Sequence, residues 1–184
     1  EAALLFSPGF AANLGVLSTL GADPETLIVS DELNHASIID GTRLARARVA
    51  VSHHGDVDHV AALLDDHPGL AIVVTDSVFS MDGDVAPVDE LAAVCADRGA
   101  LLVLDEAHAV LGPPTPTLPG LDVVVIGTLS KALGSLGGFL AAPRPYVDLL
   151  TSTARSFIFT TATPPGDAAA AAAALAIVRS PEGD

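Results

Sequence analysis

The stretch VDELAAVCADRGALLVLD, residues 88–105, decides the fold class. Its first part, residues 88–98, is rich in Ala and Leu, and Pro87 in front of it favours a helix that begins there. Its second part, residues 100–104, is a continuous apolar run, which is typical of a strand covered on both faces. A helix followed at once by such a strand is the repeating unit of an α/β sheet.

The same alternation extends in both directions from this stretch. Apolar runs predict further strands at residues 26–30, 48–52, 70–75, 122–127 and 138–142. Ala- and Leu-rich segments predict further helices at residues 11–20, 36–47, 57–66, 145–153 and 168–178. The chain is therefore expected to form one α/β domain over residues 1–184, with a mostly parallel sheet flanked by helices.

Composition narrows the class of protein. The chain has 184 residues, of which half are hydrophobic, so a sizeable core can form. A formal net charge of −15 argues against a nucleic-acid partner and against an acidic membrane surface. The single Cys95 cannot form an intrachain disulfide, which fits a cytoplasmic protein. Because the chain begins with Glu1 rather than Met, we expect it to be a piece of a longer protein.

Lys131 is the only lysine of the chain and follows a predicted strand. A desolvated lysine can lose its proton and react with a carbonyl, whereas an arginine stays protonated. This contrast with the seven arginines suggests a catalytic amine. The alternative is that Lys131 is a chance survivor in a composition that prefers arginine.

Ligands of open α/β sheets bind outside the carboxyl ends of the strands, so the residues there are candidates. Asp105 and His108 follow the strand at residues 100–104, and Ser80 lies in the segment after the strand at residues 70–75. Asp105 could instead cap a helix, His108 could be a capping or core histidine, and the Ser80 segment is also a turn.

Two predicted helix starts are further candidates. Gly9 and Phe10 open a helix whose free backbone N–H groups could hold a phosphate, although a plain helix start explains them equally well. His35 opens another helix, where its ring could stack on a flat ligand or simply cap the helix. The adjacent His53 and His54 are interpreted as solvated, and no spacing predicts a metal site.

The sequence lacks the motifs that bind nucleoside triphosphates and nicotinamide dinucleotides. The Gly-x4-Gly-Lys-Ser/Thr phosphate loop does not occur around Lys131, and no Gly-x-Gly-x-x-Gly turn follows the first strand.

Six motifs occur in the order known from one enzyme family. The chain resembles the large-domain core of the pyridoxal-phosphate-dependent α-oxoamine synthases, which have the aspartate-aminotransferase-like fold (fold type I). The motifs that carry the resemblance are SPGFAAN (7–13), DELNHASIIDG (31–41), SVFSMDGD (77–84), DEAH (105–108), TLSKALG (128–134) and FIFTT (157–161). The family's small domain has no counterpart in this chain.

The resemblance implies a role for each candidate. Lys131 would hold the cofactor covalently and act as the acid and base, and Asp105 would pair with its ring nitrogen. His35 would stack on the ring, while His108 and Ser80 would lie at its phenolic edge. The remaining implied contacts are with the phosphate: Gly9, Phe10 and Thr128 from the same chain, and Thr160 or Thr161 towards the partner subunit of a homodimer.

The implied reaction is a decarboxylating condensation of an amino acid with an acyl thioester. Segments 54–59 and 157–165 are most similar to the group that makes 8-amino-7-oxononanoate for biotin from L-alanine and a pimeloyl thioester. Glycine C-acetyltransferases, 5-aminolevulinate synthases and serine palmitoyltransferases are the alternatives within the family, and a non-catalytic domain of the same fold is the alternative outside it. Pro8, which lacks an N–H, and a shortened loop after His108 depart from the family pattern.

Overall fold

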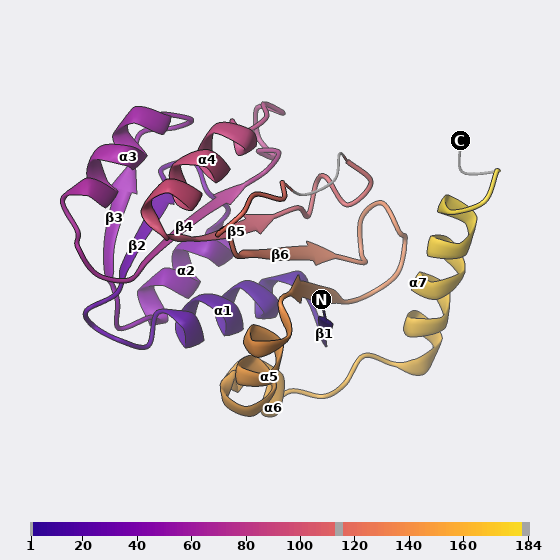
Figure 1. Ribbon diagram of the computed structural model, residues 1–184. Coiled ribbons are helices and arrows are strands. Elements are labelled where there is room, and N and C mark those ends of the chain that lie inside the picture. The colour runs from indigo at the N-terminus through magenta and orange to yellow at the C-terminus, as the bar shows by residue number, and fades with distance from the viewer. Residues whose placement is uncertain (1, 113–115, 182–184) are drawn as a thin grey trace.

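A computed structural model describes residues 2–112 and 116–181 of the chain. Its centre is a seven-stranded sheet with the order β1-β7-β6-β5-β4-β2-β3 (Figure 1). The strands are β1 (Ala2–Phe6), β2 (Leu27–Asp31), β3 (Arg48–Ser52), β4 (Ala71–Asp76), β5 (Leu101–Asp105), β6 (Val123–Thr128) and β7 (Gly138–Ala142). Strands β2 to β6 pair in parallel, and β7 is antiparallel to both of its neighbours. The expected mostly parallel sheet is confirmed.

Helices cover both faces of the sheet (Figure 1). They are α1 (Gly9–Leu20), α2 (Ala36–Leu44), α3 (Val57–Asp65), α4 (Val88–Arg98), α5 (Arg144–Thr153), α6 (Arg155–Ile158) and α7 (Pro165–Val178). Successive strand residues point to opposite faces: Ile72 and Val74 of β4 join the core under α1, α2 and α5, whereas Val73 joins the core under α3 and α4. The result is a three-layer sandwich with two apolar cores.

The predicted elements agree with the observed ones, with three exceptions. Helix α2 ends at Leu44 rather than at residue 47, because the backbone N–H groups of Arg46 and Ala47 donate to the carbonyl of Gly21 at the end of α1. Strand β1 and the short helix α6 were not predicted. The run AALLF of β1 contains no β-branched residue, and α6 has only four residues.

The expectation that every apolar run is covered on both faces is wrong for β3. This strand lies at the edge of the sheet and pairs only with β2. Val49 and Val51 are accordingly 41% and 59% exposed. A continuous apolar run therefore identified the strand correctly but not its position in the sheet.

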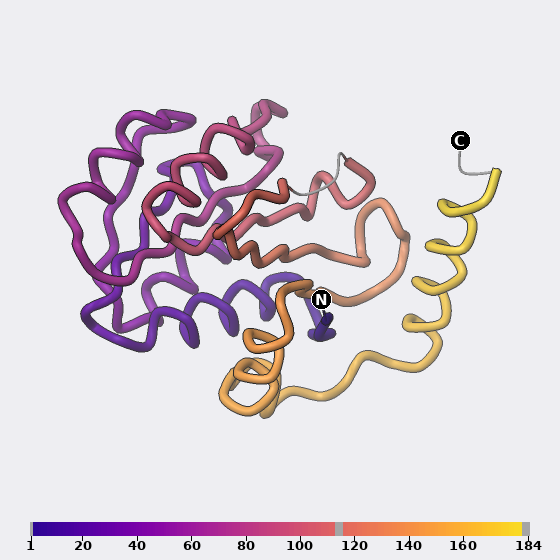
Figure 2. Tube along the Cα trace, viewed as in Figure 1, coloured from indigo at the N-terminus to yellow at the C-terminus, as the bar shows by residue number. Residues whose placement is uncertain are grey.

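Helix α7 stands apart from the other helices. Figure 2 shows the extended segment at residues 161–164 that carries the chain from α6 to α7. Ala171 is the buried residue of α7 and packs with Leu129 and Leu133, while Ser135 donates its hydroxyl to the carbonyl of Asp167 at 2.6 Å. Across the described ranges, no helix is both long enough and apolar enough to cross a membrane.

Candidate active site

The carboxyl ends of the parallel strands β4, β5 and β6 lie side by side, next to the start of α1. Parallel register places Asp76 directly beside Asp105 on the neighbouring strand. A pocket of about 210 Å³ opens at these strand ends. Its lining contains Gly9, Phe10, Asn13, His35, Ser37, Asp76, Asp105, His108, Thr128 and Lys131. Seven of the residues singled out in the sequence thus line a single pocket.

Lys131 and His108 form the most direct contact of the pocket. Lys131 Nζ lies 2.6 Å from His108 Nε2. A lysine ammonium can only donate, so Nε2 accepts and the imidazole is neutral. Burial, the positive charge of Lys131 and the nearby His35 lower the pKa of His108, although Asp105 acts in the opposite direction. A neutral imidazole in contact with an amine can take and return its proton.

Asp105 is fixed at the bottom of the pocket. It is 4% exposed, and each oxygen accepts one hydrogen bond: Oδ1 from the backbone N–H of Ala107 at 2.9 Å and Oδ2 from Asn13 Nδ2 at 2.6 Å. The alternative that Asp105 caps a helix is wrong, because a turn and not a helix follows Asp105 in the described residues. Each carboxylate oxygen keeps a lone pair for a ligand.

His35 is the N-cap of α2, as one reading of the sequence predicted. Its Nδ1 accepts from the backbone N–H of Ser37 at 3.2 Å, and its own backbone N–H donates to Asp76 Oδ2 at 2.7 Å. The ring is exposed at the pocket and meets Phe10 edge to face, with 6.5 Å between ring centroids. Capping therefore fixes the ring without covering its face.

Asp76 is a site residue to which the sequence reasoning gave no role. It is 5% exposed, and burial together with the like charge of Asp105 raises its pKa to about 7. The signal that could have found it is the one that found Asp105, an acid at the carboxyl end of a buried strand. Asn13 and Ser37 were likewise missed, although a polar residue within the apolar helix 9–20 is itself a signal.

The start of α1 approaches the sheet closely. No side chain caps this helix, so the backbone N–H groups of Gly9 and Phe10 are available to an anion. The close approach depends on Gly138 of β7, since a Cβ there would lie 2.6 Å from Gly9 Cα. Thr128, at the end of β6, is buried, and its hydroxyl lies 3.0 Å from the carbonyl of Gly137 and 2.8 Å from Ser130 Oγ.

Three predicted site residues lie elsewhere. Ser80 is in the exposed turn after β4 and does not line the pocket. Thr160 and Thr161 line a different pocket, beside β1. Of the loop after His108 that was expected to be shortened, residues 113–115 lie outside the described residues.

The expectation that His54 is solvated is wrong. Its ring bridges Asp31, with 3.0 Å from Nδ1 to Oδ1, and Asp84, with 2.7 Å from Nε2 to Oδ2. Burial alone would lower the pKa of His54, but the two carboxylates outweigh it and raise that pKa above 6.5. His54 therefore ties the turn that carries Ser80 to the end of β2. Among the described residues, no group of three or more His, Cys, Asp or Glu is arranged to hold a metal ion.

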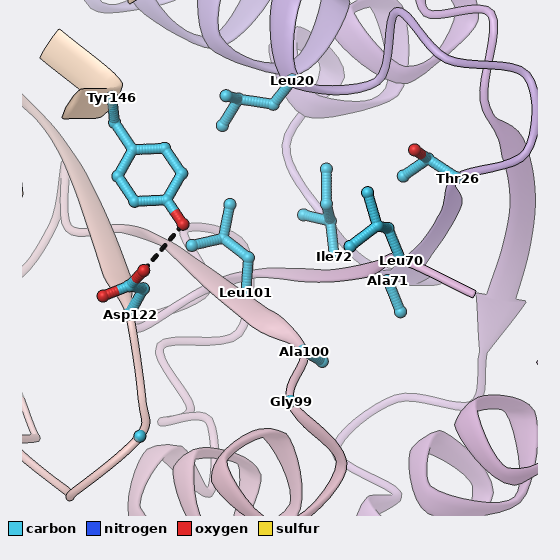
Figure 3. A pocket seen from close by; sticks show the side chains of 11 residues that line it. Leu20, Thr26, Leu70, Ala71, Ile72, Gly99, Ala100, Leu101, Asp122 and Tyr146 are labelled. Carbon is cyan, nitrogen blue, oxygen red and sulfur yellow. Dashed lines mark hydrogen bonds between the residues drawn. The ribbon is translucent and has the colours of Figure 1, made fainter. Parts of the chain in front are cut away.

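A second pocket, of about 220 Å³, lies at the amino ends of the parallel strands, opposite the first pocket (Figure 3). Leucine, isoleucine and alanine side chains line much of it, and the Tyr146 hydroxyl donates to Asp122 Oδ2 at 2.8 Å. Burial and this contact raise the pKa of Tyr146 to about 12, so its hydroxyl stays neutral at physiological pH. The first pocket, with its lysine, histidines and two buried carboxylates, is the candidate active site.

Known proteins are similar to this chain over nearly its whole length. The family model "Aminotransferase class I and II" matches residues 1–182. An 8-amino-7-oxononanoate synthase from Burkholderia thailandensis is 49% identical over 192 residues, which cover 99% of this chain and 48% of that protein. The chain spans about half the length of the curated relatives it matches.

Solved structures show the same fold. A serine palmitoyltransferase variant from S. paucimobilis with a bound PLP–myriocin aldimine has a TM-score of 0.88 and 32% identity, over 97% of this chain and 47% of that chain. An 8-amino-7-oxononanoate synthase from Francisella tularensis has a TM-score of 0.79 and 30% identity, over 98% of this chain and 55% of that chain.

Proposed function

The chain belongs to the class I and II aminotransferase family, and from this premise we propose that its pocket binds pyridoxal 5'-phosphate for the condensation of an amino acid with an acyl thioester. The observation that carries the proposal is the contact of 2.6 Å between Lys131 Nζ and His108 Nε2 in a pocket that also holds Asp105. An amine, a neutral base and a buried carboxylate are the groups that such chemistry requires.

The residues of the pocket fit the cofactor. The uncapped start of α1 offers Gly9 and Phe10 N–H groups to a phosphate, and Asp105 offers carboxylate lone pairs to a protonated ring nitrogen. His35 presents an exposed ring for stacking. When bound, the cofactor supplies an electron sink for the negative charge that develops at the α-carbon of the amino acid.

The chain's own groups then divide the work. Lys131 holds the cofactor through its amine and moves the proton at the α-carbon. His108, in contact with Lys131 Nζ, accepts the proton that the amine must lose to become nucleophilic. Asp105 keeps a positive charge on the ring nitrogen by its own fixed negative charge.

For the whole protein we propose 8-amino-7-oxononanoate synthase activity, with L-alanine and a pimeloyl thioester as substrates, in biotin biosynthesis. The curated relatives of that name at 48–51% identity over nearly the whole chain support it. The serine palmitoyltransferase structures, with TM-scores of up to 0.88, favour serine and a long acyl thioester as the second candidate.

We also propose a cytoplasmic homodimer, in which Thr160 or Thr161 contacts the phosphate bound by the partner subunit. The exposed position of both threonines and the single, buried Cys95 are consistent with this proposal. Light scattering on the intact gene product tests it: a monomer with a complete, active site would contradict the shared site.

The first experiment is an absorbance spectrum of the intact gene product with pyridoxal phosphate, then borohydride reduction and peptide mapping. We expect the cofactor on Lys131, and none fixed in Lys131→Ala or in Lys131→Arg, which keeps the charge but not the reactive amine. No cofactor on the wild-type protein would overturn the proposal and favour a non-catalytic domain.

The second experiment assigns the substrates. The holoenzyme is assayed with L-alanine, glycine and L-serine, each combined with pimeloyl-CoA, acetyl-CoA, succinyl-CoA and palmitoyl-CoA. We expect carbon dioxide and an amino ketone chiefly from L-alanine with pimeloyl-CoA. Preferred turnover of serine with palmitoyl-CoA would support the second candidate instead.

A further inference from the structure

We infer that Asn13 and Ser37 are positioning residues that join Asp105 to His35 by an unbroken row of hydrogen bonds and hold the His35 ring in one tautomer. The inference deepens the proposed function and rests on it, because that proposal assigns Asp105 and His35 to the cofactor. The row runs from the carboxylate at the end of β5, through α1, to the first turn of α2.

Counting protons fixes the direction of the row at His35. The backbone N–H of Ser37 donates to His35 Nδ1 at 3.2 Å, so Nδ1 carries no proton and the ring proton is on Nε2. Ser37 Oγ lies 2.7 Å from the same Nδ1 and must therefore be the donor. Because a hydroxyl has a single proton, Ser37 Oγ accepts in its contact of 2.9 Å with Asn13 Nδ2.

The amide of Asn13 completes the count. Its Nδ2 has two protons, one for Ser37 Oγ and one for Asp105 Oδ2 at 2.6 Å. The flipped amide would place Asn13 Oδ1 against the carboxylate, with two acceptors facing each other. In the observed orientation Oδ1 is buried and has no hydrogen-bond partner in the described part of the chain. The two hydrogen bonds donated by Nδ2 therefore fix the orientation of the amide, although they leave Oδ1 without a partner among the described residues.

The three residues of the row are buried, so each hydrogen bond depends on its own side chain. Asn13, Ser37 and Asp105 are 2%, 1% and 4% exposed, so water cannot replace a lost hydroxyl. Asp76 holds the main chain of His35 separately, through the backbone N–H at 2.7 Å. Removal of the Ser37 hydroxyl should therefore change the ring of His35 without releasing its loop.

The chemical consequence is that Nδ1 of His35 accepts and the ring proton lies on Nε2. Asp105 favours a positive charge on the cofactor ring, and a positively charged His35 stacked on that ring would repel it. The row keeps lone pairs of Asp105 directed into the pocket and keeps the proton of His35 on Nε2. Asp105 can then favour the positive charge of the cofactor ring without repulsion from His35.

The test uses the intact gene product without cofactor, labelled with ¹⁵N-histidine and studied by NMR. His35→Gln identifies the His35 signals. Ser37→Ala keeps the backbone N–H at 3.2 Å from Nδ1 but loses the shorter hydroxyl contact of 2.7 Å. We therefore expect a single Nε2–H tautomer in the wild type and a partial shift to the Nδ1–H tautomer in Ser37→Ala, while Ser37→Thr, which keeps a hydroxyl, restores the single tautomer. Ser52→Ala is the matched control, since Ser52 is 3% exposed, lies at the end of β3 and is outside the row.

Titration with pyridoxal phosphate gives a second readout. In Ser37→Ala the His35 ring has lost its shorter hydrogen bond and must be ordered when the cofactor binds, which predicts a dissociation constant about 5–10-fold higher than for the wild type. A folded Ser37→Ala protein with an unchanged His35 tautomer overturns the inference, and so does unchanged cofactor affinity. A wild-type protein that binds no cofactor overturns the proposed function instead, and the tautomer comparison still decides whether the row exists.

Discussion

At the scale of single residues, the pair Asp76 and Asp105 sets a pH response that no surface group would give. The pKa of Asp76 rises from 3.8 to about 7 on folding, so the folded chain keeps a proton that the unfolded chain releases. Folding therefore takes up a proton between about pH 4 and pH 7, and this group lowers the free energy of unfolding as the pH rises through that window.

Asp76→Asn should remove this response, since its amide oxygen can still accept from the His35 backbone N–H. We expect the free energy of unfolding of the variant, relative to the wild type, to increase by about 2–4 kcal/mol between pH 4 and pH 8. Urea denaturation at both pH values measures it. A constant difference across this range would show that Asp76 is ionised throughout.

Asp105→Asn tests the charge of the other member of the pair. The variant keeps the shape of the side chain but loses the negative charge, so we expect the turnover number of the holoenzyme to fall about 100-fold. Asp97→Asn is the control, because the side chain of Asp97 is 84% exposed on α4. Steady-state assays compare the two, and an active Asp105→Asn enzyme would contradict the assigned role.

At the scale of elements, the contact between α1 and β7 fixes the position of the start of α1, where we propose that the phosphate binds. A Cβ on Gly138 would lie 2.6 Å from the backbone nitrogen of Gly9 and 2.7 Å from the carbonyl carbon of Pro8. Gly138→Ala must therefore displace the start of α1, and we expect a loss of about 1–3 kcal/mol of stability. Chemical denaturation measures the loss, and the cofactor dissociation constant should rise in parallel.

Gly166→Ala is the control for this glycine, since a Cβ there would meet nothing within 4 Å and Ala favours the helix. Equal stability of Gly138→Ala and the wild type would mean that the two elements can separate without cost.

The turn that carries Ser80 depends on His54. Because folding raises the pKa of His54, its contribution is complete below pH 6.5 and disappears as the pH rises through the folded value. We expect His54→Gln to cost about 1 kcal/mol more at pH 5.5 than at pH 8.5, as urea denaturation would show. His53→Gln is the matched control on the neighbouring exposed ring. A cost that is the same at both pH values would contradict an ionic contact of His54 with Asp31 and Asp84.

Sequence patterns predicted these elements well because the signals are local. The apolar runs of β4, β5 and β6 identify buried strands, and the rule that ligands bind beyond strand ends singled out Asp105 and Lys131. The partners of His54 and Asn13 were missed because they lie far away in the chain: Asp84 is 30 residues from His54, and Asp105 is 92 residues from Asn13. No local pattern encodes such pairings.

At the scale of the whole molecule, the net charge of −15 acts on every element at once. Repulsion within the folded state is stronger than in the expanded unfolded chain, and salt screens it. We expect an increase from 0.01 to 0.15 M NaCl to stabilise the protein by about 1 kcal/mol, which raises Tm by about 2–4 °C. Calorimetry measures the shift, and a fall in Tm would show that ion pairs such as Arg98 with Asp65 outweigh the net repulsion.

The pairing of β1 with β7 has a consequence for how the protein is made. The first described strand of the chain hydrogen-bonds only to the last, Ala2 beside Ala142 and Phe6 beside Gly138. During synthesis on the ribosome, β2, β3 and β4 can assemble early, whereas β1 must wait until about 130 further residues have been added. Because Gly9 follows β1 so closely, the part of the pocket at the start of α1 takes shape only at this late step.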